Sequence, residues 1–350
     1  MDREIITPST PFQTQIFNEH TPMIPYNWLT EAQQRISPHI NLTPLTYDPD
    51  NLIYLKWENY QVTGSFKARG AINKMLSLQD WEIRKGIVTA SAGNHGQGVA
   101  LAGQIANSNV IVYASKHAVR EELSTITEMG AEIRLVDGGF DKAEEEGRSY
   151  AQKEDMTWIS PYNDGQVIAG QGTIGLEVME DPTFIDRHKQ TTWIVPTSGG
   201  GLISGLCIAL KSPKHPPGCI RLVGVQSEAS AFMYSIFRQG TQENVADLPT
   251  IADGLSGAVE RKSVTIPIVK KYVDDLVLVT EQEITDAISF AWKSYNEKIE
   301  GAAATALAAV ISGKISDRPV VLILSGGNIA PSLHQRIIKR EWKAEDLNKN

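Results

Sequence analysis

Three shortages in the sequence each exclude a class of protein. Two cysteines, Cys207 and Cys219, give neither a disulfide framework nor a zinc-site pattern, and they suit a reducing compartment. No run of about 18 apolar residues exists, so no membrane span is expected. Basic residues number 33 against 41 acidic ones, a formal net charge of -8 that argues against nucleic-acid binding. The first 30 residues hold no apolar secretion signal, so a cytoplasmic protein is expected.

The length of 350 residues suits two lobes, because domains of about 100–200 residues are usual. Short apolar runs predict strands at 53–56, 86–90, 110–113, 132–136, 193–196, 222–225 and 320–324. Helical patterns are found at 28–36, 99–105, 119–129, 141–153 and 202–210. This alternation predicts an α/β fold of two lobes with parallel or mostly parallel sheets. The polar segment after Ile338 is expected to be frayed.

Glycine is concentrated at three places where a parallel sheet holds its ligands, the carboxyl ends of strands. These runs cover residues 91–98, 197–202 and 325–328. The first two also open helices, whose N-termini carry unpaired backbone N–H groups that bind anions. Three consecutive glycines at 199–201 let the backbone curl around a phosphate. A tight turn explains any single run, but three in one chain favour a cradled ligand.

Residues 170–175 match the G-x-G-x-x-G pattern of dinucleotide sites. No clear strand precedes them, and the next predicted strand ends in Thr197 and Ser198 rather than in an acidic residue. A nicotinamide site is therefore rejected. The sequence also lacks a P-loop, a G-x-S-x-G elbow and histidines at metal-ligand spacing.

Lys67 stands at an unusual place, because Gly64 and Ser65 before it are typical of a helix start. The N-terminal end of a helix repels cations, so a lysine there is electrostatically misplaced. A surface lysine is the ordinary explanation. The alternative is a lysine whose amine is used covalently, since neutralisation or imine formation removes the objection.

Six ordered motifs resemble the serine/threonine dehydratase family of pyridoxal-phosphate (PLP) enzymes, which have the tryptophan-synthase β fold, or fold type II. The motifs lie at residues 63–71, 91–98, 167–173, 198–201, 250–255 and 325–328. They run from about residue 43 to residue 329, which is most of the chain. The resemblance implies PLP as cofactor and a small hydroxy amino acid as substrate.

The resemblance also implies roles for individual residues. Lys67 would hold PLP as a Schiff base and act as general base, and Phe66 would pack near the ring. Asn94 would hydrogen-bond the phenolic oxygen, and Ser325 would meet the pyridine nitrogen, which makes the ring a weaker electron sink suited to β-elimination. Further cofactor contacts would come from Ser198, Gly199, Gly200, Gly201, Leu202 and Gly254. The substrate carboxylate would be held by Ser91, Ala92, Gly93, Asn94 and His95.

The division into lobes follows from the same resemblance. Residues 1–84 with 164–350 would form a large PLP-binding lobe, with an N-terminal extension at 1–42. Residues 85–163 would form a small mobile lobe that closes over the substrate. No regulatory domain like that of feedback-inhibited threonine dehydratases is expected after Ser325. A homodimer is also expected.

Three departures from the family's pattern refine these expectations. Ala92 stands where serine racemases carry a serine as second base, which favours a dehydratase. Gln226 and Phe232 stand where the family's divalent-cation site has Glu and Asp, so no metal is expected. The family's Glu-Pro-Ser-Gly-Ala appears here as residues 300–303, Glu-Gly-Ala-Ala, which still predicts a close-packed helix start with an altered shape on the substrate side.

The sequence thus predicts a PLP-dependent ammonia-lyase that converts L-threonine, L-serine or both to a 2-oxo acid and ammonia by β-elimination. A lyase for 3-hydroxyaspartate or a diamino acid, or an amino-acid racemase, stays open as an alternative. From another class, the chain would be a catalytically silent PLP-binding or amino-acid-sensing protein. The presence of Lys67, Asn94 and Ser325 together argues against that reading.

Overall fold

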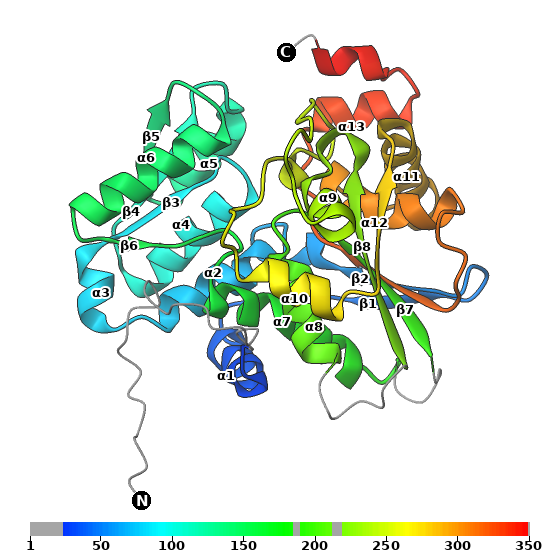
Figure 1. The fold of residues 1–350 in the computed structure, drawn as a ribbon, viewed down its shortest axis with the longest axis horizontal. Helices are drawn as coiled ribbons and strands as arrows, with labels where there is room; N and C mark the ends of the chain where they lie inside the picture. The colour runs from blue at the N-terminus through cyan, green and yellow to red at the C-terminus, as the bar shows by residue number, and fades with distance from the viewer. Residues whose placement is uncertain (1–23, 185–189, 212–218, 349–350) are drawn as a thin grey trace, which may run out of the picture.

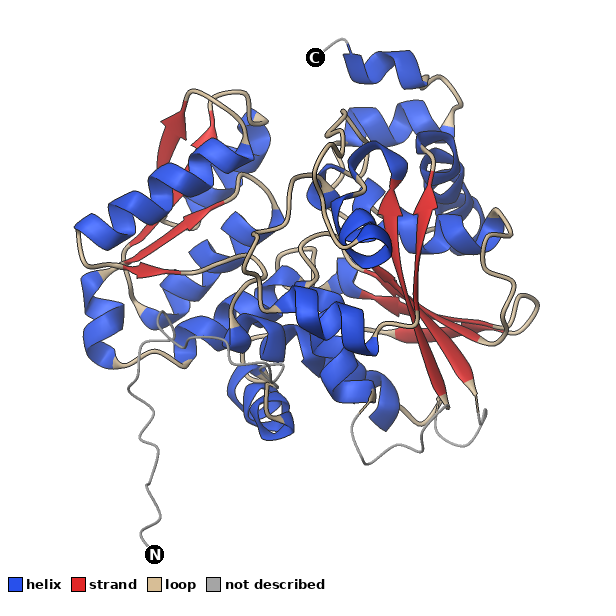
Figure 2. Cartoon of the chain, in the orientation of Figure 1, coloured by secondary structure: helices blue, strands red, loops and turns tan. Residues whose placement is uncertain are grey.

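A six-stranded sheet runs through the larger part of the computed structural model, which describes residues 24–184, 190–211 and 219–348 (Figures 1 and 2). Its strand order is β1–β2–β10–β7–β8–β9. Neighbouring strands are parallel except β1 and β2, which are antiparallel. The strands are β1 (Leu45–Asp48), β2 (Ile53–Trp57), β7 (Thr191–Pro196), β8 (Ile220–Ser227), β9 (Asp275–Val279) and β10 (Val320–Leu324).

A second, four-stranded sheet lies beside the first and has the order β5–β4–β3–β6, all parallel (Figure 2). Its strands are β3 (Ile87–Ala90), β4 (Val110–Ser115), β5 (Glu132–Val136) and β6 (Thr157–Trp158). The predicted α/β fold with mostly parallel sheets is confirmed, and all seven predicted strands are present. All four strands of this sheet fall within residues 85–163, while the lobe boundaries and the closing motion stay a prediction.

Helices cover the sheets and connect their strands. Those of the first half are α1 (Tyr26–Ile36), α2 (Lys67–Leu76), α3 (Asp80–Lys85), α4 (Asn94–Ala106), α5 (Arg120–Glu128), α6 (Phe140–Lys153) and α7 (Gly165–Glu180). Those of the second half are α8 (Gly201–Leu210), α9 (Phe232–Gln239), α10 (Thr265–Tyr272), α11 (Glu281–Tyr295), α12 (Gly301–Ile311) and α13 (Pro331–Ile338). Short 3-10 turns lie at Glu58–Tyr60, Glu228–Ser230, Asp253–Leu255 and Ala344–Asn348. None of the helices so described is both long and apolar enough to cross a bilayer.

Both faces of the large sheet are buried. Trp193 and Val195 of β7 belong to the core cluster shared with α7, α8, α9 and α10. Ile194, between them, belongs to the cluster shared with α11 and α12. Because successive strand residues point to opposite faces and both faces are covered, a central strand such as β10 is apolar on both of its faces. The five residues of β10, Val-Val-Leu-Ile-Leu, are all buried for this reason.

The G-x-G-x-x-G segment at 170–175 lies inside helix α7, which begins after its N-cap residue Asp164. Its glycines are contact points between helices. A Cβ on Gly172 would stand 2.7 Å from the Gly205 carbonyl oxygen of α8, and one on Gly170 would stand 2.5 Å from the Arg69 carbonyl oxygen of α2. The segment therefore packs helices together, as the resemblance implied, and it forms no dinucleotide turn.

The two ends of the described chain are packed against the core. In the predicted N-terminal extension, Leu29, Ala32 and Ile36 of α1 are fully buried, while residues 1–23 lie outside the described part. The expectation that the segment after Ile338 is frayed is wrong for residues 339–348. Trp342 is buried in the core beside α11 and α12, and Arg336 pairs with Asp346. Two apolar side chains, Trp342 and Leu347, and the ion pair hold this otherwise polar segment against the core.

Candidate active site

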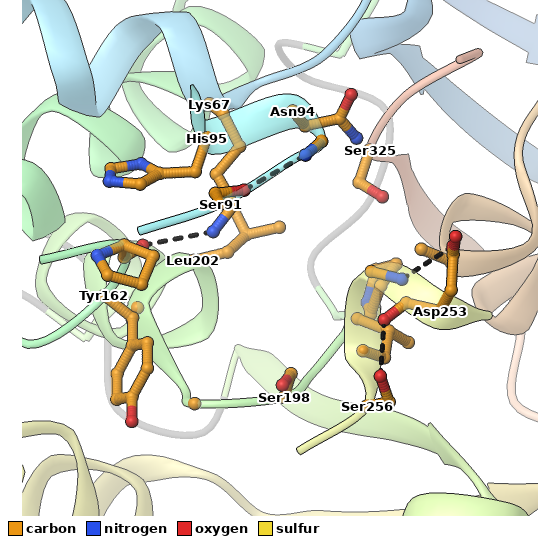
Figure 3. Close-up of a pocket in the computed structure, with 18 of the residues that line it drawn as sticks. Lys67, Ser91, Asn94, His95, Tyr162, Ser198, Leu202, Asp253, Ser256 and Ser325 are labelled. Atoms are coloured by element: carbon orange, nitrogen blue, oxygen red, sulfur yellow. Dashed lines mark hydrogen bonds between the residues drawn. The ribbon is translucent and has the colours of Figure 1, made fainter. Parts of the chain in front are cut away.

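The loops that follow β3, β7 and β10 line one cavity of about 290 Å³ between the two sheets (Figure 3). Every residue expected to bind the cofactor or the substrate carboxylate lines it: Phe66, Lys67, Ser91, Ala92, Gly93, Asn94, His95, Ser198, Gly199, Gly200, Gly201, Leu202, Gly254 and Ser325. Figure 3 shows Lys67, Asn94 and Ser325 along one edge of this space, with Ser198 and Asp253 across it. The carboxyl ends of parallel strands are the usual ligand site of such folds.

The start of α2 is fixed to the end of β10 by backbone hydrogen bonds. The Phe66 N–H donates to the Ser325 carbonyl oxygen at 3.0 Å, and the Gly327 N–H donates to the Gly64 carbonyl oxygen at 2.9 Å. The Lys67 N–H donates to the Ser65 hydroxyl at 3.3 Å, so the predicted helix start is real. Residues about 260 positions apart in sequence are held together in this way.

Lys67 is a half-buried lysine whose amine holds its proton more weakly than an exposed lysine does. Its Nζ donates one hydrogen bond, to the Pro161 carbonyl oxygen at 3.1 Å. Burial lowers the pKa of Lys67 to about 8, against the opposing attraction of Glu300. A larger fraction of this amine is neutral near pH 7 than of an exposed lysine, which is what a nucleophile or base requires.

The glycine loop after β7 has room for a phosphate. Gly200 has a φ of +84°, which a side chain would disfavour, and α8 begins directly after it. The Thr265 hydroxyl fixes the loop by donating to the Gly199 carbonyl oxygen at 2.6 Å. Gln171 lies against Gly201, and both polar atoms of its buried amide lack a hydrogen-bond partner among the described residues. Helix-start N–H groups and an unsatisfied amide beside a half-buried lysine fit a phosphorylated carbonyl cofactor such as PLP.

The turn after β3, at residues 91–95, leads into helix α4. The Gly93 N–H donates to the Ser91 hydroxyl at 3.2 Å, and α4 begins at Asn94, so its first N–H groups border the cavity. His95 lies 3.3 Å through Nε2 from the Ile159 carbonyl oxygen. Burial and the Lys67 charge lower the pKa of His95 to about 3, so its ring is neutral near pH 7.

Glu300 is the main site residue that sequence reasoning missed. It precedes α12, is buried, and lines the cavity beside Asn94. Burial raises the pKa of Glu300 to about 8, although hydrogen bonds from Asn94 oppose the shift. Its motif position was visible in the sequence, but its contact with Asn94, 206 residues away, was not.

Two further carboxyl groups also line the cavity. Glu122 comes from α5 beside the small sheet, and Asp253 from the motif at 250–255. Burial, with the nearby charge of Asp253, raises the pKa of Glu122 to about 7. Among the described residues that line the cavity, Lys67 is the only lysine or arginine. The cavity therefore has more acidic than basic groups.

The region after β8, where the family's cation site was sought, is filled by other contacts. The Gln226 side chain accepts a hydrogen bond from the Tyr234 N–H at 2.6 Å and donates to the Ser230 carbonyl oxygen at 3.4 Å. Phe232 is buried in the core. Within residues 24–184, 190–211 and 219–348, no group of three or more His, Cys, Asp or Glu side chains is arranged to hold a metal. Metal independence stays a prediction.

Comparisons with known proteins agree with this geometry. Residues 34–326 match the family described as "Pyridoxal-phosphate dependent enzyme". The L-threonine ammonia-lyase of Thermotoga maritima is 40% identical over 326 residues, which are 91% of this chain and 79% of that one. The catabolic L-threonine dehydratase of Escherichia coli is 40% identical over 312 residues, 86% and 92% of the two chains. A tomato (Solanum lycopersicum) threonine deaminase structure superposes with a TM-score of 0.80 at 28% identity, covering 95% and 99%. A serine racemase of Dictyostelium discoideum superposes with a TM-score of 0.77 at 33% identity, covering 87% and 98%.

Proposed function

The chain belongs to the pyridoxal-phosphate dependent enzyme family, and from that premise we propose that it is an ammonia-lyase for L-threonine, L-serine or both. The products would be a 2-oxo acid and ammonia. One observation carries the proposal: Lys67, the glycine loop at 199–201 and the turn at 91–95 line a single cavity. A reactive amine, a phosphate cradle and a carboxylate-binding turn are the three parts that the reaction needs.

The residues divide the work as follows. PLP supplies an electron sink that weakens the Cα–H bond of an amino acid joined to it. Lys67 would hold the cofactor covalently and, once displaced by the substrate amine, take the Cα proton on Nζ. Backbone N–H groups of residues 91–95 would orient the substrate carboxylate, and those of 198–202 the cofactor phosphate. Ser325 would meet the pyridine nitrogen and Phe66 would pack near the ring, while Gly254 lines the same cavity.

The charges in the cavity support a neutral side chain on the substrate. The carboxyl groups of Glu122 and Asp253 line the cavity, and the Lys67 amine would be committed to the cofactor. A substrate with its own side-chain carboxylate, such as 3-hydroxyaspartate, would find no cation there and would be repelled. A diamino acid is the second candidate, because Glu122 and Asp253 would attract a side-chain ammonium group.

Ala92 gives the cavity wall a methyl group where a second base would be needed for racemisation. Elimination is therefore proposed as the main reaction. The test is a panel assay on the PLP-loaded protein, with 2-oxo acid and ammonia measured for threonine, serine, 3-hydroxyaspartate and a 2,3-diamino acid. Fastest turnover of threonine or serine, with little D-amino acid formed, is expected. No 2-oxo acid from any of the four would revive the silent-binder alternative.

The homodimer and the cytoplasmic location also belong to this proposal. Leu42, Tyr60 and Val62 are exposed apolar side chains, and the Asn41 amide joins their two segments by donating to the Tyr60 carbonyl oxygen at 2.8 Å. Such a patch suits contact with a second copy of the chain. Light scattering is expected to give twice the chain mass, and a single-chain mass at working concentrations would contradict the dimer.

A further inference from the structure

Glu300 is the acceptor at the centre of an amide network on the cavity wall. The Asn94 side-chain Nδ2 donates to both of its carboxyl oxygens, at 2.9 Å and 3.0 Å. The backbone N–H of Asn328 donates to Oε2 at 3.2 Å. The Glu300 N–H in turn donates to the Gly326 carbonyl oxygen at 3.1 Å, which ties the residue to the loop after β10.

The opposite end of the Asn94 amide is held as well. Its Oδ1 accepts from the Asn328 side-chain Nδ2 at 2.6 Å, and that nitrogen also donates to the Thr63 carbonyl oxygen at 2.8 Å. Because Asn328 can only donate through this nitrogen, the orientation of the Asn94 amide is determined by the network. The Asn94 Nδ2 therefore points to Glu300, and this nitrogen is the donor proposed for the cofactor's ring oxygen.

The acidic groups around Glu300 disfavour a negative charge on its carboxyl group. Lys67 attracts a negative charge on Glu300 from α2, but Asp253 and Glu122, which also line the cavity, repel it. The carboxyl group is itself buried, with only 8% of the residue exposed. An ionised Glu300 would also hold Lys67 as an ammonium ion and so remove its amine from chemistry.

We propose that Glu300 is a positioning residue of this active site: its buried carboxyl group accepts from the Asn94 amide and the Asn328 N–H and so fixes Asn94 for binding the cofactor's ring oxygen. The inference rests on the proposed function only through the bound cofactor. A neutral carboxyl group has one acceptor oxygen and one O–H group. Glutamine has the same shape and keeps an acceptor oxygen at the place of Oε2, to which both Asn328 and Asn94 donate, while its NH₂ group replaces Oε1, the second acceptor of Asn94.

The test compares three variants as PLP-loaded proteins: Glu300→Gln, Glu300→Ala and, as a matched control, Glu297→Gln. Glu297 lies three residues earlier and contacts Asn59 and Tyr60 outside the cavity. The readouts are the dissociation constant of PLP and the visible absorbance of the bound cofactor from about pH 6 to pH 9, a range that brackets the pKa of Glu300.

The unsubstituted protein is expected to show an absorbance change near pH 8, and Glu300→Gln is expected to lack this change while binding PLP like the control. Glu300→Ala leaves the Asn94 amide without its acceptor, and PLP binding is expected to weaken by about 10–100-fold. If Glu300→Ala does not fold, the pH profile of Glu300→Gln still decides.

Two results would overturn the inference. One is a Glu300→Gln protein with the same pH-dependent spectrum as the unsubstituted protein. The other is a Glu300→Gln protein that loses PLP, because that would require a charged carboxylate. A protein that shows the expected spectra but forms no 2-oxo acid supports the role of Glu300 and overturns the proposed function, so the two failures are distinguishable.

Discussion

Helix α2 carries two basic residues two positions apart, the half-buried Lys67 and the fully buried Arg69, and the surroundings give them opposite properties. Arg69 lies in a cluster whose charges balance. Lys67 lies in a cavity where carboxyl groups outnumber it. Arg69 thus carries a charge that stabilises the fold, whereas Lys67 has an amine that can take part in a reaction.

The Arg69 cluster is completely paired. Arg69 donates to Glu58 at 2.7 Å and 2.8 Å and to Glu177 at 2.5 Å and 2.9 Å. Lys56 donates to the same Glu177 at 2.6 Å and to the Thr43 carbonyl oxygen at 2.7 Å. Burial alone would raise the pKa of Glu58, but the charge and hydrogen bonds of Arg69 outweigh it and lower that pKa. Glu58 and Arg69 are thus both held in their charged forms.

In the cavity the shifts run the other way. Burial lowers the pKa of Lys67 to about 8 and raises that of Glu300 to about 8 and that of Glu122 to about 7. Each group is pushed towards its neutral form, where proton transfer near pH 7 becomes easy. The two basic residues of α2 therefore belong to different sites: Arg69 to a cluster that stabilises the fold, and Lys67 to the cavity proposed for catalysis.

Replacing Lys67 has the largest expected effect on activity. Lys67→Ala removes both the cofactor link and the proposed base, so turnover is expected to fall by about 10³-fold or more. The melting temperature is expected to stay near that of the unsubstituted protein. Steady-state 2-oxo acid formation and thermal unfolding check this, with exposed Lys153→Ala as control. Activity retained in Lys67→Ala would remove the distinction between the two cations.

Replacing Arg69 is expected to lower the stability of the fold, which Lys67→Ala leaves unchanged. Arg69→Met leaves Glu58 and Glu177 buried with too little positive charge, which costs about 3–5 kcal/mol of folding free energy. Denaturant unfolding measures this loss. A stability within about 0.5 kcal/mol of the unsubstituted protein, the range usual for surface changes, would show that the cluster is not structural.

A Glu→Gln substitution is expected to change the pH dependence of folding stability in opposite directions in the Arg69 cluster and in the cavity. The folded-state pKa of Glu58 lies below its ordinary value of 4.5, so this carboxylate stabilises the fold above that pH and loses its contribution in acid. Glu58→Gln should therefore destabilise at pH 7 by about 3 kcal/mol, with the difference shrinking as the pH falls. Unfolding curves at several pH values measure it.

The pKa of Glu300 is instead raised from 4.5 to about 8, so the folded state keeps a proton that the unfolded chain releases. Between those values the stability of the unsubstituted protein falls as pH rises. Relative to it, Glu300→Gln should gain on the order of 2 kcal/mol between about pH 5 and pH 8. If the stability of Glu300→Gln relative to the unsubstituted protein instead fell with rising pH, as expected for Glu58→Gln, the contrast between the two regions would be contradicted.

The smallest expected effect concerns substrate choice. Glu122→Gln removes one repelling charge, so kcat/KM for 3-hydroxyaspartate relative to serine should rise by about 3–10-fold at pH 8 and less at pH 6. The pKa of Glu122, raised to about 7, explains why the effect grows with pH. Its exposed neighbour gives the control, Glu121→Gln. An unchanged ratio at pH 8 would mean that Glu122 does not face the substrate.

The strands and the glycine loops could be predicted from the sequence, because each is written in a few consecutive residues. The five apolar residues of β10 and the three glycines after β7 are examples. Helix α7 was missed as a helix, because its glycines have poor helix propensity and matched a nucleotide motif. The glycines of α7 are needed for its close packing against α2 and α8, and a local sequence pattern does not reveal which helices pack together.

Only part of the chemistry of the site could be predicted from the sequence. The motifs pointed to Lys67 and Asn94, and both line the cavity. The carboxyl groups of Glu300, Glu122 and Asp253 come from separate elements, and their effect depends on burial and mutual repulsion. The folded-back segment at 339–348 was missed for the same reason, since the apolar side chains of Trp342 and Leu347 and one ion pair outweigh a polar composition.

The most direct test of the central claim is to find which lysine carries the cofactor. The PLP-loaded protein is reduced with borohydride, which fixes the cofactor on the lysine that holds it, then digested and examined by mass spectrometry. The account predicts that the pyridoxyl group is found on the peptide containing Lys67 and on no other. A pyridoxyl group on a different lysine, or an unmodified Lys67 in fully loaded protein, would contradict it.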